Sequence, residues 1–252
     1  MHRIILAFST GLVLALAGID GGHADDAKPA EVIVLSTLHQ LHDQTAGYTF
    51  EDLSTIIENL SPDILAVELT ASDLESRRDQ PTKQEYQRSV FPLLDKHQYE
   101  VIPLEPSEPL FSELVGLLRA SSEQLQEQSP AVADTFKVYT ESLYSLLSER
   151  WVTAAAVNSP DTDILFESKH RFQSAIFGHA EARVWDEWNQ HFLQKILAAA
   201  TTNPGKRILV LVGAEHAYWL RAHLKSIDIN LLDTSALLDE FFNATTSNEN
   251  RR

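Results

Sequence analysis

Short runs of apolar and β-branched residues occur in two parts of the chain, one near each end. Apolar runs of about four to eight residues between turn residues are typical of strands that are buried on both faces of a sheet. The sequence predicts five such strands: Glu31–Leu38, Asp63–Leu69, Tyr99–Leu104, Arg207–Val212 and Ile229–Leu232. We therefore expect a central sheet that is built from the two strand-rich ends.

Amphipathic segments separate the first three strands. Phe50–Leu60 is predicted to be a helix, with Thr49 as its N-cap and Glu51 and Asp52 in its first turn, where carboxylates favour the positive end of the helix dipole. A second helix is predicted over Pro81–His97. Strands that alternate with helices at this spacing indicate βαβ units. The expected fold class is α/β, with a mixed, largely parallel central sheet and a helical insertion or cap.

The middle of the chain, residues 107–203, has the apolar spacing of helices instead of strands. We interpret it as a helical insert in a single α/β domain that spans residues 25–242. A last helix is predicted over Thr234–Phe242, and the polar residues 243–252 are predicted to be a disordered tail. Turn residues divide the insert at Ser129-Pro130, Asn158-Ser159-Pro160 and Asn203-Pro204-Gly205.

The first residues have the three parts of an export signal. Met1-His2-Arg3 is basic, Ile4–Gly18 is an apolar run of 15 residues, and Gly22-His23-Ala24 places small residues at a cleavage site. A membrane-spanning helix needs about 20 residues, so an uncleaved anchor is the less favoured alternative. We predict that residues 1–24 are a signal peptide, and that the mature protein is periplasmic or secreted, with no stable membrane anchor.

The composition restricts the chemistry of the mature chain. The sequence has no Cys and its one Met is Met1, which excludes thiolate nucleophiles, disulfides and thiolate metal sites. The formal net charge is −16. Because an acidic surface repels a phosphate backbone, we expect no nucleic-acid partner. A small molecule or a peptide is the expected substrate, acted on by groups such as His, Glu and Asn.

Polar residues stand at the ends of four predicted strands. His39, Glu68 and Glu105 end or follow the first three strands, and His216 follows the fourth. In open α/β sheets, ligands bind beyond the carboxyl ends of the strands. Two His and two carboxylates at that edge would hold a divalent metal ion or form a general acid/base set. The alternative for any single His is a structural hydrogen bond.

The segment from Gly213 to His216 is the most specific part of this pattern. A Gly at the end of a strand permits a tight turn and a close approach of other groups to its backbone. His216 then falls near the N-terminus of the next helix, where the helix dipole disfavours its protonation. A neutral imidazole is what a metal ligand or a general base requires. Glu215 is the less favoured participant, because His216 is expected to point into the cleft.

Three segments resemble motifs of the TraB/PrgY/TIKI-like superfamily, to which erythromycin esterase-like and ChaN-like proteins are distantly related. In the family pattern, strands end in G-x-x-H or in Glu, and an Arg-Asn pair lies on a helix before the last motif. Here Ser36 replaces the first Gly, Asn189 takes the Asn position, and Trp188 stands where Arg is usual. The segments are VLSTLH (34–39), SPDILAVEL (61–69) and VLVGAEH (210–216).

The resemblance implies an exported, metal-dependent hydrolase of peptides or esters. It carries over His39, Glu68, Asn189 and His216, whereas Glu105 depends mainly on the strand-end argument. We expect His39, Glu68 and His216 to bind a divalent metal ion, Zn, Mn or Co, whose bound water attacks a carbonyl. Glu105, His216 and Asn189 are the expected catalytic residues.

Three alternatives stay open at this point. In a metal-free hydrolase, His39 or His216 would act as general base. In a binding protein, the cap and the sheet would enclose a small ligand, including haem, which ChaN-type proteins bind. A family member that has lost catalysis is the third. Outside the strand ends, we expect His42 to be a solvated loop residue and His170 to lie on a helix surface.

Overall fold

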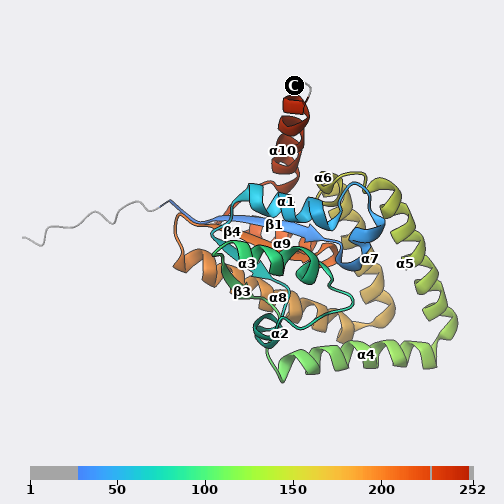
Figure 1. Ribbon diagram of the computed structural model, residues 1–252. Coiled ribbons are helices and arrows are strands. Elements are labelled where there is room, and N and C mark those ends of the chain that lie inside the picture. The colour runs from blue at the N-terminus through green and yellow to red at the C-terminus, as the bar shows by residue number, and fades with distance from the viewer. Residues whose placement is uncertain (1–27, 228, 250–252) are drawn as a thin grey trace, which may run out of the picture.

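A computed structural model describes residues 28–227 and 229–249, so the predicted signal peptide lies outside the described residues. Within this part of the chain, five strands form one sheet in the order β3-β2-β4-β1-β5, and all the pairings are parallel (Figure 1). The α/β class and the central sheet are confirmed, and the sheet is parallel throughout. Its strands are β1 (Glu31–Thr37), β2 (Ile64–Val67), β3 (Glu100–Pro103), β4 (Arg207–Gly213) and β5 (Asn230–Leu231).

Strand β4, from the C-terminal part of the chain, lies between the two N-terminal strands β1 and β2. Thr37 of β1 is in register with Gly213 of β4, and Val67 of β2 is in register with Leu211. All residues of β4 after Arg207 are buried. A strand that is covered on both faces needs a nearly continuous apolar run, which is why RILVLVG suits the centre of the sheet.

The first helix, α1 (Phe50–Leu60), has the predicted bounds. Asp52 N–H donates to Thr49 Oγ1, and the Asp52 carboxylate accepts from Thr49 N–H, which completes a capping box. The predicted helix over Pro81–His97 is shorter and interrupted. A wide π turn spans Tyr86–Val90 and leads into α3 (Phe91–Lys96). Pro92 explains the wide turn, because it lacks an N–H and its ring clashes with the carbonyl oxygen one turn earlier.

The middle of the chain is helical, as predicted. In Figure 1, α4 and α5 form an outer frame, whereas α7 and α8 lie against the body of the protein. Phe166 of α7 and Phe192 of α8 are fully buried in the same core as the strands, so the insert and the sheet share one core. The helices are α4 (Leu110–Gln128), α5 (Pro130–Arg150), α6 (Ala154–Val157), α7 (Pro160–Phe177) and α8 (His179–Thr202).

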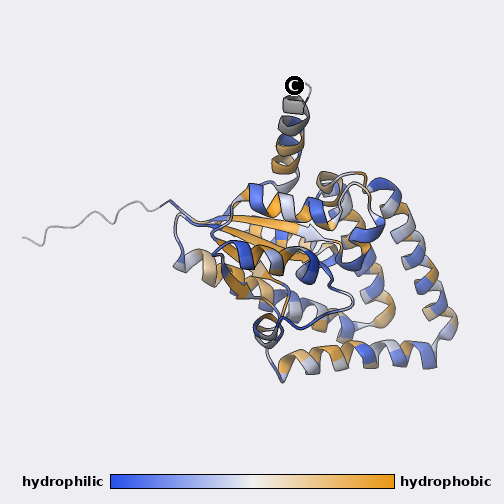
Figure 2. Ribbon diagram, in the orientation of Figure 1, coloured by the Kyte–Doolittle hydropathy of each residue, from blue (hydrophilic) through white to orange (hydrophobic). Residues whose placement is uncertain are grey.

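Three further α-helices lie in the described part of the chain, besides a 3₁₀ helix over His39–Gln44. The sequence did not predict α2 (Ala71–Ser76), which follows β2 and is capped by Thr70. Helix α9 (Ala214–Lys225) follows β4 directly. The last helix, α10 (Thr234–Glu249), continues beyond Phe242, where the sequence analysis placed the start of a disordered tail. Figure 2 shows apolar strands at the centre and polar residues on the outer helices. None of the helices in the described ranges has the length and hydropathy to cross a membrane.

Candidate active site

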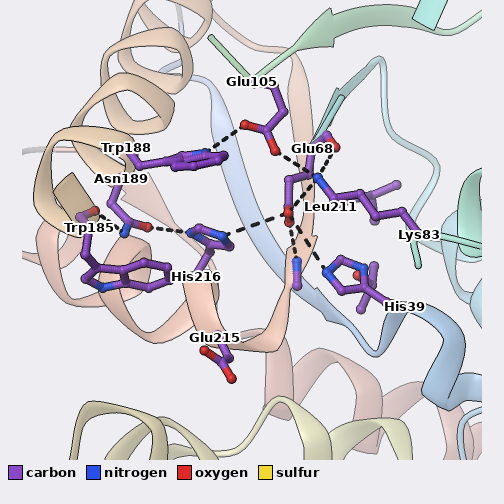
Figure 3. A network of polar contacts seen from close by, with 12 residues as sticks. His39, Glu68, Lys83, Glu105, Trp185, Trp188, Asn189, Leu211, Glu215 and His216 are labelled. Carbon is purple, nitrogen blue, oxygen red and sulfur yellow. Dashed lines mark hydrogen bonds and ion pairs between the residues drawn. The ribbon is translucent and has the colours of Figure 1, made fainter. Parts of the chain in front are cut away.

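The carboxyl edge of the sheet gathers the predicted site residues. Since β4 lies between β1 and β2, the end of each of these strands brings one group to the same place: His39, Glu68, and the Gly213 turn that leads to His216. Glu105 joins them from the end of β3. Asn189 reaches them from α8, so the structure brings all five predicted residues together in one polar network (Figure 3).

Glu68 is the centre of this network. Its side chain is 4% exposed, and its Oε2 accepts a 2.6 Å hydrogen bond from Gly213 N–H. Burial would raise the pKa of this carboxyl. Lys83 first, then His216 and His39, and last the Gly213 hydrogen bond outweigh burial and hold the pKa well below its usual range. Glu68 is therefore a buried carboxylate that stays ionised.

Lys83 supplies the positive charge beside Glu68. Its Nζ lies 2.9 Å from Glu68 Oε1 and donates to the Glu68 carbonyl oxygen at 2.9 Å and to Glu105 Oε1 at 2.8 Å. Burial disfavours the ammonium, but the two carboxylates outweigh burial and raise the pKa of Lys83 above its usual value. The sequence did not identify Lys83 as a site residue, because Lys83 falls within the predicted helix Pro81–His97 and not at the end of a predicted strand.

Glu105 is held on its other side by an indole. Trp188 Nε1 donates to Glu105 Oε2 at 2.7 Å. Burial and the nearby charge of Glu68 raise the pKa of Glu105, although Lys83 opposes this effect. Trp188, at the position where the family pattern has Arg, thus takes part in the network through a neutral N–H donor.

His39 is fixed by a second buried carboxylate, Glu85. His39 Nδ1 lies 2.7 Å from Glu85 Oε1, which also accepts from Thr37 Oγ1 at 3.0 Å. The side chain of Glu85 is 0% exposed and that of His39 is 28% exposed. Burial disfavours the imidazolium, but the charge and hydrogen bond of Glu85 outweigh burial and raise the pKa of His39. With its Nδ1 held, His39 presents Nε2 to the site.

His216 is fixed by Asn189. Asn189 Nδ2 donates to the Trp185 carbonyl oxygen at 2.8 Å, so its Oδ1 is the atom that lies 2.9 Å from His216 Nδ1. This arrangement assigns the proton of the neutral ring to Nδ1 and leaves a lone pair on Nε2. Burial lowers the pKa of His216 to about 4, so the ring is neutral at physiological pH.

A cavity of about 320 Å³ opens in front of the two histidines. His39, Gly213 and His216 line one side, and Glu215 lies beside them. Four aromatic residues of the helical insert form a second part of the wall, and residues next to His39 and Gly213 form the rest: Tyr144, Trp151, Phe166 and Trp185 from the insert, with Thr37, Leu38, Gln40, Leu41 and Ala214. The volume is near the lower end of the range of about 300–1,000 Å³ for small-molecule pockets.

Glu215 was the less favoured participant, yet it lies in the cavity wall, held by three residues of the insert. It accepts hydrogen bonds from Tyr144 Oη and, at 2.7 Å, from Lys169 Nζ, and its Oε2 lies 2.9 Å from His170 Nε2. Burial would raise the pKa of Glu215, but His170 and Lys169 outweigh burial and lower it. His170 is buried and stacks on Trp185, which corrects the expectation of a helix-surface residue.

The expectation for His42 was also wrong. His42 is 1% exposed rather than solvated, accepts from Leu38 N–H through Nε2, and lies 2.7 Å from the Tyr48 carbonyl oxygen through Nδ1. Both ring nitrogens are therefore used within the 3₁₀ helix (His39–Gln44) that follows β1 and its next turn, and His42 is a structural residue.

The donor set fits a metal ion poorly in this arrangement. His39 Nε2 and His216 Nε2 each lie 3.9 Å from Glu68 Oε1, whereas ligands of one tetrahedral zinc ion lie about 3.4 Å apart. The same Oε1 is already in contact with the Lys83 ammonium. Across the described residues, no three His, Cys, Asp or Glu side chains are grouped so that they could hold a metal ion.

Comparisons with models of protein families, with curated proteins and with solved structures gave no match. The resemblance to the TraB/PrgY/TIKI-like superfamily therefore stays a prediction. The fold and the site define an α/β protein with two histidines, three buried carboxylates and a lysine at the carboxyl edge of a parallel sheet, beside a cavity that is partly lined by aromatic residues.

Proposed function

We propose that this protein is a hydrolase of small esters or amides, in which His39 is the general base that activates water. The observation that carries the proposal is the His39–Glu85 pair. A buried carboxylate holds Nδ1 at 2.7 Å, and His39 lines the cavity. A carboxylate at Nδ1 fixes the tautomer of the ring and stabilises the imidazolium that forms when Nε2 takes a proton.

The reaction follows from the groups that line the cavity. His39 Nε2 takes a proton from water, and the oxygen of that water forms a bond to the substrate carbonyl carbon. The charge that develops on the carbonyl oxygen is stabilised by the N-terminal amides of α9, at Ala214 and Glu215, because the first amides of a helix lack intrahelical partners. His39 then gives its proton to the leaving alcohol or amine, and the products are an acid and that leaving group.

The other site residues position these groups. Asn189 fixes the tautomer of His216, whose Nε2 lone pair accepts from the second hydrogen of the water. Glu105 acts through Lys83, since one oxygen of Glu105 is bonded to the ammonium and the other to Trp188. Lys83 and Gly213 hold the Glu68 carboxylate between the two histidines.

The cavity supports a small substrate with an apolar acyl group. Its aromatic wall favours contact with apolar atoms, and the charge of Glu215 is already balanced by Lys169. A volume of about 320 Å³ would hold a small ester or the end of a peptide.

Hydrolysis of p-nitrophenyl acetate, butyrate and octanoate and of peptide p-nitroanilides tests the proposal. We expect turnover by the wild type and a loss of about 10²- to 10⁴-fold in kcat/KM for His39→Ala, the usual contribution of a general base. His97→Ala is the matched control, because His97 is a partly exposed histidine that also pairs with a glutamate, Glu58, but neither residue belongs to the site network. No turnover of any of these compounds, or equal activity of His39→Ala and wild type, would contradict the proposal.

The metal-dependent form of the reaction, with His39, Glu68 and His216 as ligands of Zn, Mn or Co, is the second candidate. It is supported by the kinds of donor at this edge, two imidazoles and a carboxylate, and it requires that they move closer together than the 3.9 Å at which they stand. Metal analysis of the purified protein tests it, because the metal-dependent form needs about one ion per chain. Haem binding stays a prediction of the resemblance, tested by a Soret band that is lost in His39 or His216 variants.

Export also stays a proposal. It is supported by the basic, apolar and small-residue segments of residues 1–24. N-terminal sequencing of the protein recovered outside the cytoplasm would begin at Asp25 if cleavage follows Ala24.

A further inference from the structure

Three oxygen atoms surround the ammonium of Lys83. Its Nζ lies 2.9 Å from Glu68 Oε1, 2.9 Å from the Glu68 carbonyl oxygen and 2.8 Å from Glu105 Oε1. The two carboxylate side chains are 4% and 3% exposed, and the Lys83 side chain is 17% exposed. Figure 3 shows Lys83 entering the network from the side opposite His216, with Glu68 between them. A positive charge is therefore enclosed by oxygen ligands.

The atoms around Glu68 are of the kinds that bind divalent metal ions. Two carboxylates and a carbonyl oxygen face the ammonium, and the Nε2 atoms of His39 and His216 flank Glu68 Oε1 at 3.9 Å. Oxygen and imidazole donors of this kind suit Zn and Mn. However, the position next to Glu68 Oε1 and Glu105 Oε1, where such an ion would bind, is occupied by the ammonium of Lys83.

We propose that Lys83 is a tethered cation that takes the place of a divalent metal ion in this site. The wild-type site is then complete without metal, and removal of the lysine side chain leaves a cation site whose ligands are the three oxygen atoms that now surround the ammonium, from the Glu68 carboxylate, the Glu68 carbonyl and the Glu105 carboxylate. This inference extends the proposed function. It rests on that proposal only in treating the site as catalytic.

The charges explain why a metal ion and Lys83 exclude each other. With Lys83 in place, a divalent ion at Glu68 would stand within a few ångströms of an ammonium, and like charges at that separation repel strongly in a buried site. Without Lys83, two buried carboxylates would have no counter-charge, which is unfavourable until a cation enters. A divalent ion carries the charge that would neutralise both carboxylates.

Metal titration of the full mature chain tests the proposal. We would titrate wild type and Lys83→Met with Zn²⁺ and with Mn²⁺ by calorimetry, and follow the melting temperature with and without each ion. Met keeps most of the volume of the lysine stem but has no charge. The wild type should bind neither ion tightly and should melt at the same temperature in both conditions. Lys83→Met should melt lower, bind about one ion per chain about 100-fold or more tightly than wild type, and regain stability when the ion binds.

Two further variants make the result specific. Lys206→Met is the matched control, because Lys206 pairs with the exposed carboxylate of Glu100 outside the site, and this variant should bind metal no better than wild type. The double variant Lys83→Met/Glu68→Gln should lose the gained affinity, because it lacks the central ligand.

Several results would overturn the proposal. Tight binding of one ion by the wild type, lost in His216→Ala, would show that Lys83 does not replace a metal. A folded Lys83→Met that binds no more metal than wild type would show that no latent site exists. Should Lys83→Met fail to fold, Lys83→Gln is measured in its place. If neither variant folds with or without metal, the inference is also overturned, because a matching ion would restore the fold. Ester hydrolysis by wild type and His39→Ala is assayed separately, so a failure of this inference leaves the test of the hydrolase intact.

Discussion

The backbone N–H of Gly213 donates a 2.6 Å hydrogen bond to the Glu68 carboxylate, which joins the ends of β4 and β2. The same glycine lies against His39 on the other side, since a Cβ placed on Gly213 would stand 2.5 Å from His39 Nε2. One residue without a side chain therefore lets a carboxylate and an imidazole from the two neighbouring strands approach each other. This close approach gives the first prediction.

Gly213→Ala should displace His39 and reduce hydrolysis strongly. The added methyl group cannot fit at 2.5 Å from Nε2, so the ring must leave its position beside Glu85. We expect a loss of about 10²-fold in kcat/KM for p-nitrophenyl acetate, the low end of the contribution of a general base, and a destabilisation of about 1–3 kcal/mol.

Gly116→Ala is the control for that substitution. Gly116 lies in α4, and a Cβ added there meets nothing within 4 Å. Alanine should stabilise this helix by about 0.5–1 kcal/mol and leave hydrolysis unchanged. Urea unfolding measures both stabilities, and full activity of Gly213→Ala would contradict the close approach of Gly213 and His39.

Glu85→Gln should lower the pKa of His39. In the wild type, the charge of Glu85 raises that pKa above 6.5 in spite of burial, and a general base works only after it has lost its proton. The rate of p-nitrophenyl acetate hydrolysis should therefore rise with pH through a pKa above 6.5, and Glu85→Gln should move this rise to lower pH. An NMR titration of the His39 ring checks the pKa without a substrate.

The raised pKa of His39 should also make the stability of the protein depend on pH. A histidine whose pKa is raised in the folded state binds its proton more tightly there than in the unfolded chain. Its contribution to stability is fully present below pH 6.5 and is lost as the pH rises through the folded pKa of His39. Glu85→Gln should remove this dependence, which unfolding at several pH values would show. An unchanged His39 titration in this variant would mean that Glu85 carries no charge.

His216 should produce the opposite dependence on pH. Burial lowers its pKa from 6.5 to about 4 in the folded protein, so the unfolded chain binds a proton that the folded protein does not. Stability should fall as the pH falls from 6.5 to about 4, by roughly 3 kcal/mol from this residue. His216→Asn should reduce the slope of the free energy of unfolding in that range, whereas His97→Asn should not. Equal slopes for His216→Asn and wild type would contradict the lowered pKa.

Arg221 should be important for stability rather than chemistry. Its guanidinium makes two hydrogen bonds to Asp163 of α7, at 2.9 and 2.7 Å, and donates to the Val34 carbonyl oxygen of β1 at 2.7 Å. Arg221→Leu leaves the Asp163 carboxylate without its ion-pair partner, whereas the Val34 carbonyl oxygen keeps its hydrogen bond from Thr234 Oγ1, and we expect a loss of about 3–5 kcal/mol in the free energy of unfolding. Arg171→Leu is the control, because its side chain is 81% exposed, and should change stability by less than about 0.5 kcal/mol. A loss of similar size in both variants would rule out this role for the Arg221–Asp163 pair.

The regular elements and part of the site could be predicted because they depend on neighbours along the chain. The bounds of α1 follow from the capping residues Thr49 and Asp52 and from the period of the apolar residues. His39, Glu68 and His216 could be found because polar residues directly after buried strands fall at the edge where parallel strands end. By contrast, one continuous helix was predicted across the π turn, although Pro92 in the sequence indicates a break there.

The arrangement of the site was decided by the tertiary structure. The position of β4 between β1 and β2 places Gly213 against both Glu68 and His39, and strand order depends on packing between segments that are far apart in the sequence. Lys83 and Glu85 lie at the start of the segment that was predicted to be one helix, just before the π turn, so their charges could be placed only once this segment had folded against the sheet. The sequence by itself determined which strand ends carry polar, ionisable side chains. Long-range packing decided which charges face one another, because the energy of a buried charge depends on what lies within a few ångströms of it in space.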